Sequence, residues 1–145
     1  EMRAKVRQVM NKYPDNKPVV FIDYLTLIRP QNHYNGSVHQ QVTEISQGLK
    51  NMAKDFDIHV VCLAQLNREV EKRADKRPMM SDIRESGSVE QDADNIIFLY
   101  REKYYNKESD SDKMELIVAK ARNGATLTIE VRYNEATGEI RDEYY

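Results

Sequence analysis

Two runs of apolar, mostly β-branched residues constrain the fold of this chain most strongly. Residues 19–25 and residues 60–64 are almost continuously apolar, and each run ends beside a polar side chain. Between them, apolar residues recur at helical spacing over about residues 42–56. Unbroken runs of this kind are typical of parallel strands that are buried on both faces. The order strand, helix, strand therefore predicts a parallel pair joined by a helical crossover.

Further elements extend this pattern on both sides. The apolar spacing predicts a helix over residues 2–12, a third buried strand over 96–100, and a hairpin of 115–120 with 126–133. We expect an α/β fold with a mostly parallel sheet and an antiparallel C-terminal hairpin. The length of 145 residues allows one domain with a sizeable core.

The charge balance excludes only the simplest kind of nucleic-acid binding. The formal net charge of −2 argues against a protein that coats nucleic acid by bulk electrostatics. Residues 68–84 nevertheless hold six cationic and four acidic side chains. No stretch approaches the roughly 18 apolar residues of a membrane helix, so no membrane partner is expected. A single cysteine, Cys62, excludes an internal disulfide and fits a reducing cytoplasm.

Two polar side chains follow the first two predicted strands. Asp23 comes at the carboxyl end of the first, where parallel sheets bind ligands, and could hold Mg²⁺ through water as a Walker B aspartate does. Gln65 ends the second, where an amide can sense a γ-phosphate or orient water. An ordinary turn aspartate and an amide that satisfies loop backbone are the alternatives.

Two later segments combine cations with a flexible backbone. Within residues 81–94, Arg84 and Gly87 suit a phosphate backbone, whereas the acidic residues of the same segment would repel one. A solvated charged loop fits the composition equally well. Lys120 and Arg122, two residues apart near a strand end, could reach one polyphosphate, or could belong to an exposed turn.

Several motifs do not occur in the sequence. None of the five glycines begins G-x-x-x-x-G-K-S/T, so this sequence contains no Walker A phosphate cradle. The three histidines and Cys62 lack the spacing of a zinc site, and no G-x-S-x-G nucleophile elbow is present.

Taken together, five motifs in order resemble the DnaB family of replicative DNA helicases. The runs 21–25, 64–68, 73–78, 81–94 and 120–124 are similar to the family's Walker B, its S-Q-L-N-R motif, the segment after it, its R-E-S-G signature and its K-x-R-N-G motif. The resemblance covers roughly residues 1–133 and implies the second half of a RecA-like P-loop ATPase domain. It implies that residues 1–145 form one incomplete domain, and the start at Glu1 favours a piece of a longer protein.

The resemblance also implies a role for each matching residue. Asp23 would hold the Mg²⁺ of bound ATP, and Gln65 would contact the γ-phosphate side and couple it to the DNA loops. The segment with Arg84, Glu85 and Gly87 would grip single-stranded DNA, with Glu85 contributing backbone NH or a salt bridge. Finally, the cations Lys120 and Arg122 would act in trans on a neighbour's ATP, as an arginine finger does.

At the level of the whole protein, the resemblance implies an ATP-driven helicase in a homo-hexameric ring, which moves 5′→3′ on single-stranded DNA. A helicase loader and primase are possible partners, and the location is the cytoplasm. Because no Walker A is present, we expect the isolated chain to lack ATPase activity. In RecA-like sheets the strand that carries Walker A lies between the second and third predicted strands. Without that strand, each of the two would expose an edge. Three alternatives follow: the two strands pair directly, a separate polypeptide supplies the missing strand, or the chain is the remainder of a longer protein.

Two other functions agree with parts of the sequence. A motor half that keeps its cations and DNA segment could be a non-catalytic assembly or inhibitory module that docks into a helicase ring. A RecA-like recombination protein would have the same kind of sheet, but the R-E-S-G and K-x-R-N-G motifs argue against this class of protein.

Overall fold

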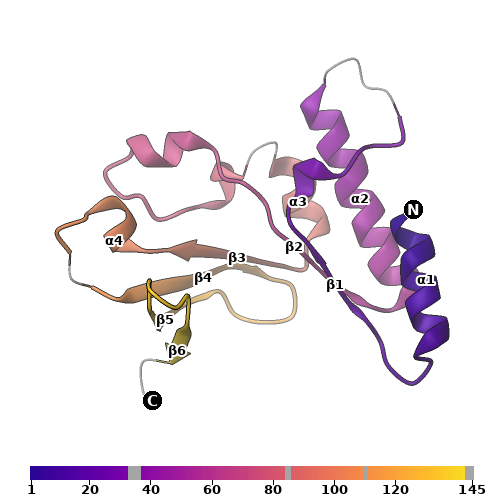
Figure 1. The fold of residues 1–145 in the computed structure, drawn as a ribbon. Coiled ribbons are helices and arrows are strands. Elements are labelled where there is room, and N and C mark those ends of the chain that lie inside the picture. Colours follow the sequence, from indigo (N-terminus) through magenta and orange to yellow (C-terminus); the bar gives the residue numbers. More distant parts are fainter. Residues whose placement is uncertain (33–36, 84–85, 110, 143–145) are drawn as a thin grey trace. The chain divides into compact units, whose positions relative to one another are not determined.

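The computed structural model describes residues 1–32, 37–83, 86–109 and 111–142 of the chain, without the side chain of Ser86. The chain divides into two compact units (Figure 1). The first unit holds residues 1–65 and 85–93, and the second holds residues 66–84 and 94–145. Each unit is described by itself.

The first unit is built on a parallel strand pair with helices. In chain order it contains α1 (Met2–Lys12), β1 (Val19–Ile22), a 3-10 turn (Leu25–Leu27), α2 (Val38–Phe56), β2 (His59–Cys62) and α3 (Ser86–Asp92). Val19 pairs with His59 and Ile22 with Cys62, in parallel register. The predicted first helix, second helix and parallel pair are therefore confirmed.

Helix α2 begins earlier than its apolar stripe indicates. Ser37 caps its N-terminus, and its hydroxyl accepts a hydrogen bond from the Gln40 amide at 3.4 Å. At the other end Asp57 adopts a left-handed conformation with φ of 51° and stops the helix. The first turn contributes little to the core, so periodicity alone places the start near Val42.

Side chains from α1, α2 and the strands form two buried clusters in the first unit. Val6, Met52 and Ile58 make one cluster, against which Val20 and Val60 of the strands pack. Leu25, Val42 and Ile45 make the other. The helices thus cover one face of the β1–β2 pair.

The prediction that these strands are buried on both faces is wrong. Along each strand, half-buried and exposed residues alternate, and Phe21 is 76% exposed. Val19, Val61 and Leu63 are also exposed on this pattern. The sequence run is continuous because both faces are apolar, but α1 and α2 bury only one of them. A continuous apolar run shows that both faces of a strand are apolar, but it does not show how many of these faces other elements cover.

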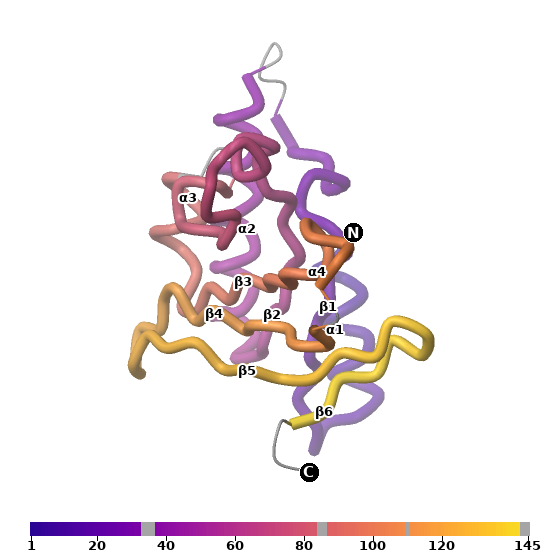
Figure 2. Tube along the Cα trace, turned by 90° about the vertical axis from the view of Figure 1, so that its left-hand side faces the viewer, coloured from indigo at the N-terminus to yellow at the C-terminus, as the bar shows by residue number. Residues whose placement is uncertain are grey.

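The second unit contains an antiparallel sheet in the order β3-β4-β5-β6 (Figure 2). Its elements are β3 (Asn95–Tyr100), the short helix α4 (Glu102–Tyr105), β4 (Lys113–Ala121), β5 (Leu127–Tyr133) and β6 (Ile140–Asp142). The predicted hairpin is confirmed as β4 and β5, and Val118 pairs with Leu127 beside its turn.

The expected mostly parallel sheet is wrong for the described residues, although the mixed α/β class is confirmed. Among the strands of the described ranges, one pairing is parallel and three are antiparallel. The reason is that β3, β4, β5 and β6 follow one another along the chain, and each pairs with the next in antiparallel register. Strand β2 belongs to the two-stranded sheet and β3 to the four-stranded sheet. Ile96 and Phe98 of β3 are buried, whereas Ile97 and Leu99 are exposed, so β3 also buries one face.

A buried ion pair organises the segment before Arg84. The guanidinium of Arg73 donates two hydrogen bonds of 2.8 Å to the carboxylate of Asp82, which is 4% exposed. The same carboxylate accepts the Met79 amide at 2.8 Å. Leu66 and Ile83, at the two ends of the segment, form an antiparallel bridge. This part of the chain is therefore a loop that closes around the buried carboxylate of Asp82, and it is not a fully solvated loop.

We predict that Asp82→Ala lowers the unfolding free energy by about 2–3 kcal/mol at neutral pH, because it leaves the partly buried Arg73 without its partner. Burial alone would raise the pKa of the Asp82 carboxyl, but hydrogen bonds from Arg73 and Met79 and the charge of Arg73 lower it. A lowered folded-state pKa stabilises the fold above about pH 4 and loses that contribution as the pH falls through the lowered value.

Urea unfolding of the wild type and variant at pH 7 and pH 3 checks this expectation, and the difference in unfolding free energy between the two proteins should be smaller at pH 3 than at pH 7. Glu69→Ala is the control, because Glu69 forms an exposed pair with Lys72. An equal difference at both pH values would contradict the role of the carboxylate charge.

Candidate functional site

Asp23 and Gln65 follow the two parallel strands on adjoining backbones. The amide of Leu63 donates to the carbonyl of Ile22 at 2.9 Å, and the amide of Leu25 donates to the carbonyl of Leu63 at 2.9 Å. These bonds tie the chain on both sides of Asp23 to the strand that leads into Gln65. Because the pair is parallel, both side chains belong to the same edge of this two-stranded sheet. The sequence prediction that brings Asp23 and Gln65 to one edge agrees with this geometry.

The chain after Asp23 is anchored while Asp23 itself is exposed. Leu25 is 6% exposed and packs with Val42 and Ile45 of α2. An exposed carboxylate on a fixed backbone suits a divalent cation held through water or a single oxygen. Among the described residues no group of three or more His, Cys, Asp or Glu side chains could enclose a metal ion. Mg²⁺ is commonly bound by one or two carboxylates with phosphate and water, so Asp23 fits this mode of binding.

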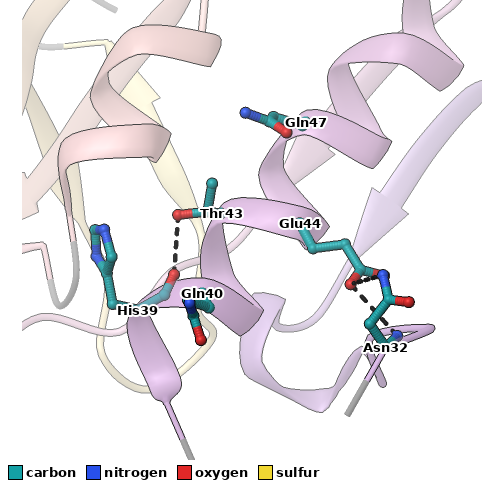
Figure 3. Close-up of a pocket in the computed structure, with 6 residues that line it drawn as sticks. All are labelled: Asn32, His39, Gln40, Thr43, Glu44 and Gln47. Carbon is teal, nitrogen blue, oxygen red and sulfur yellow. Dashed lines mark hydrogen bonds between the residues drawn. The ribbon is translucent and has the colours of Figure 1, made fainter. Parts of the chain in front are cut away.

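A shallow pocket on α2 contains none of the predicted site residues (Figure 3). Its lining includes His39, Thr43 and Glu44. The Glu44 carboxylate accepts a hydrogen bond from the backbone amide of Gln31 at 2.6 Å and another from the side-chain amide of Asn32 at 3.0 Å. These bonds fasten the chain that follows β1 to α2, which gives the polar face a structural role.

The predicted DNA segment is described only in part. Arg84 and Glu85 lie outside the described residues. Gly87 is exposed, and a Cβ added to it would meet no atom within 4 Å. It belongs to α3, a helix that sequence reasoning missed because its apolar content is low. Val89 of this helix packs on the buried cluster of Leu25, Val42 and Ile45.

One acid of this segment is held by a buried hydroxyl. The Ser46 hydroxyl, in a residue 7% exposed, donates to Oδ2 of Asp92 at 2.7 Å. This bond joins α3 to α2. The carboxylate that sequence reasoning counts as repelling phosphate therefore has a structural partner.

Lys120 and Arg122 stand at the end of β4. Lys120 pairs with Ile96, but the next pair towards the N-terminus of β4 is Val118 with Ile97, so Ala119 is an extra residue in a β-bulge. Bulges change the direction of the side chains beside them and occur often near active sites. Arg122 is the first residue of the turn after β4. Both cations belong to the second unit, whereas Asp23 and Gln65 belong to the first.

Asp94 is a partner of Arg122 that sequence reasoning missed. Its Oδ1 lies 2.9 Å from Nε of Arg122, and its carbonyl accepts the Arg122 amide at 2.8 Å. Charge signs alone group Asp94 with the acids that oppose phosphate binding. The sequence patterns gave no signal for this contact, because it depends on the antiparallel pairing of β3 with β4, which brings the residues that flank the two strands together.

These features define a class of protein before any comparison. An aspartate and a glutamine at adjoining carboxyl ends of a parallel pair, with cations on a separate hairpin, are typical of nucleotide-hydrolysing α/β domains. The family model of the DnaB-like helicase C terminal domain matches residues 1–142, and the chain belongs to this family.

Known relatives agree with this assignment. The chain is 47% identical to the replicative DNA helicase DnaB of Geobacillus stearothermophilus over 134 residues, which cover 92% of the chain and 29% of the relative. It is equally similar, at 47% over 134 residues, to the replicative DNA helicase DnaC of Bacillus subtilis (strain 168), again over 29% of that protein. The chain thus spans less than a third of these two relatives.

Solved structures match the fold closely. A DnaB-like replicative helicase, described with its interactions with primase, aligns with a TM-score of 0.92 and 46% identity over 97% of this chain and 34% of that chain. A solved ATPase domain aligns with the same TM-score and identity over 97% of this chain and 50% of that one. No helix among the described residues is long and apolar enough to cross a membrane.

We predict that Gly87→Ala does not lower the unfolding free energy and raises it by up to about 1 kcal/mol, because the added Cβ meets open space and alanine favours helix. If the backbone at Gly87 approaches a phosphate, the same change weakens single-stranded DNA binding by the full-length protein. Thermal unfolding and fluorescence anisotropy with a labelled oligonucleotide measure the two effects. Wild-type DNA affinity in a stable Gly87→Ala protein would contradict a close backbone approach.

Proposed function

We propose that this chain forms part of the ATP-driven motor of a replicative DNA helicase, which translocates on single-stranded DNA and unwinds duplex at the replication fork. The observation that carries the proposal is the placement of Asp23 and Gln65 at the adjoining ends of β1 and β2. Membership of the DnaB-like helicase family supports it.

At the nucleotide, each residue has a distinct task. Asp23 holds the Mg²⁺ of ATP, which would supply charge neutralisation at the phosphates. The amide of Gln65 contacts the γ-phosphate side and reports its presence to the DNA-binding segment. Both tasks need an exposed side chain on a fixed backbone, as the bonds from Leu63 and Leu25 provide at Asp23.

The cations act on a different nucleotide from Asp23. Lys120 and Arg122 would reach the ATP of a neighbouring subunit and stabilise the charge of its transition state, as arginine fingers do. This arrangement requires a ring in which each ATP lies between two subunits, and we propose the homo-hexamer that the family resemblance implies. It is supported by the position of both cations beside a hairpin turn, at the end of β4.

The DNA strand would be bound by Arg84, Glu85 and Gly87, with contacts to the phosphate backbone rather than to bases. A helicase loader and primase are the expected protein partners. One structural relative is described with its interactions with primase, which supports primase as a candidate. We place this activity in the cytoplasm, in agreement with the single cysteine.

We also propose that residues 1–145 form only part of an ATPase domain. The exposed apolar side chains of β1 and β2, with those of β3 and β5, are an unusual surface for a complete domain. The alignment with half of a solved ATPase domain supports the same conclusion.

We predict that the isolated chain hydrolyses ATP no faster than background, because its sequence has no Walker A segment to hold the β- and γ-phosphates. A coupled phosphate-release assay with Mg²⁺ measures this rate. Robust turnover that Asp23→Ala abolishes would overturn the proposal. The rival inhibitory module predicts in addition that the chain changes the unwinding rate of an intact family helicase when the two are mixed.

In the full-length protein, we predict that Arg122→Ala lowers kcat for ATP by about 10³-fold and leaves nucleotide affinity nearly unchanged, because a trans cation stabilises the transition state more than the ground state. Steady-state ATPase and binding of a fluorescent ATP analogue separate the two quantities. A large loss of binding would instead indicate a contact to nucleotide within the same subunit.

A further inference from the structure

The ion pair between Asp94 and Arg122 lies directly beside the β3–β4 ladder and is accompanied by a backbone hydrogen bond. Besides the 2.9 Å contact of Oδ1 with Nε, the Arg122 amide donates to the Asp94 carbonyl at 2.8 Å. The next residues inward, Asn95 and Ala121, are partners in the β3–β4 ladder. Two contacts, one from the backbone and one from the side chain, therefore close the end of this ladder.

The contact also restrains the guanidinium close to the aliphatic stem. Asp94 meets Arg122 at Nε, the nitrogen nearest the aliphatic stem. A guanidinium has five N–H donors in a rigid plane, so a partner at Nε restrains rotation of the whole group. The two Nη nitrogens are the farthest part of the side chain from the stem. Arginine binds phosphate oxygens in a bidentate manner through two neighbouring N–H groups.

We propose that Asp94 is the positioning residue for Arg122, and that it holds the guanidinium in the orientation needed to meet a phosphate of the neighbouring subunit's ATP. This inference rests on the proposed function of Arg122. Preorganised charge lowers a barrier more than mobile charge does, because no reorganisation is needed at the moment of reaction. The acidic character of Asp94, which opposes phosphate when considered alone, thus has a use beside an arginine finger.

The chain supplies a closely matched control pair. Asp112 and Arg132 also lie in the second unit, at 2.9 Å, with side chains 50% and 49% exposed, whereas Asp94 and Arg122 are each 51% exposed. Removal of either carboxylate costs a similar half-exposed ion pair. Only Asp94, however, contacts a residue that we assign to ATP hydrolysis.

The test uses the full-length helicase with Asp94→Ala, Asp112→Ala, Arg122→Ala and the double variant of Asp94 and Arg122. We expect Asp94→Ala to lower kcat about tenfold, with KM for ATP and thermal stability close to those of Asp112→Ala. In the Arg122→Ala background, Asp94→Ala should have no further effect on kcat, because its partner is already absent. Asp94→Glu, which keeps the charge, should recover part of the activity.

Other outcomes overturn the inference. Unchanged kcat in Asp94→Ala, an increase in kcat, or an equal loss with and without Arg122 would each show that Asp94 does not orient this cation. If Arg122→Ala itself leaves kcat unchanged, the proposed function of Arg122 fails, and that result is distinct from failure of Asp94→Ala alone. Should Asp94→Ala unfold, Asp94→Asn keeps the side-chain shape and answers the same question by the same kcat comparison.

Discussion

Parallel pairing of β1 with β2 is the constraint on which the candidate nucleotide site depends. In an antiparallel pair Asp23 and Gln65 would leave from opposite ends, so neither side chain could assist the other. The pairing in turn depends on α2, which supplies the crossover and buries Val42, Ile45 and Met52 against the sheet and its neighbours. Leu25, two residues after Asp23, is buried in the same cluster as Val42 and Ile45. The backbone beside Asp23 therefore also depends on packing against α2.

The acidic residues around the R-E-S-G segment pose the main physical difficulty for the proposed DNA binding, and three of them have partners within the protein. Asp82 is bound by Arg73, Asp92 by Ser46, and Asp94 by Arg122. A carboxylate that accepts strong hydrogen bonds inside the protein projects less negative charge towards a nearby strand than a solvated one. The partners of these three acids therefore reduce the repulsion that phosphate would meet at the proposed DNA-binding segment.

Sequence patterns predicted where helices and strands form better than they predicted what packs against each of them. The helices at residues 2–12 and 42–56, the parallel pair and the hairpin were all recoverable, because each has a strong local period or turn signal. Helix α3 was missed because Val89 is its one apolar anchor and Ser46, its hydrogen-bonding partner, is 46 residues away from Asp92. Burial on both faces was wrongly predicted for Phe21 and Ile97, because hydrophobicity shows what a face could bury and not what covers it. Likewise, charge signs alone could not pair Arg73 with Asp82.

The candidate site residues also differ in whether the sequence or only the fold brings them together. Asp23 and Gln65 could be grouped from sequence because one topological rule, parallel pairing, brings strand ends together. Asp94 and Arg122 needed the register of β3 with β4, including the extra residue Ala119, since a shift of one position would turn Arg122 away from Asp94. A motif therefore identifies which cation acts, whereas strand register determines which neighbour directs it. For this reason the acid beside the proposed arginine finger is found from the fold rather than from the motif that contains the arginine.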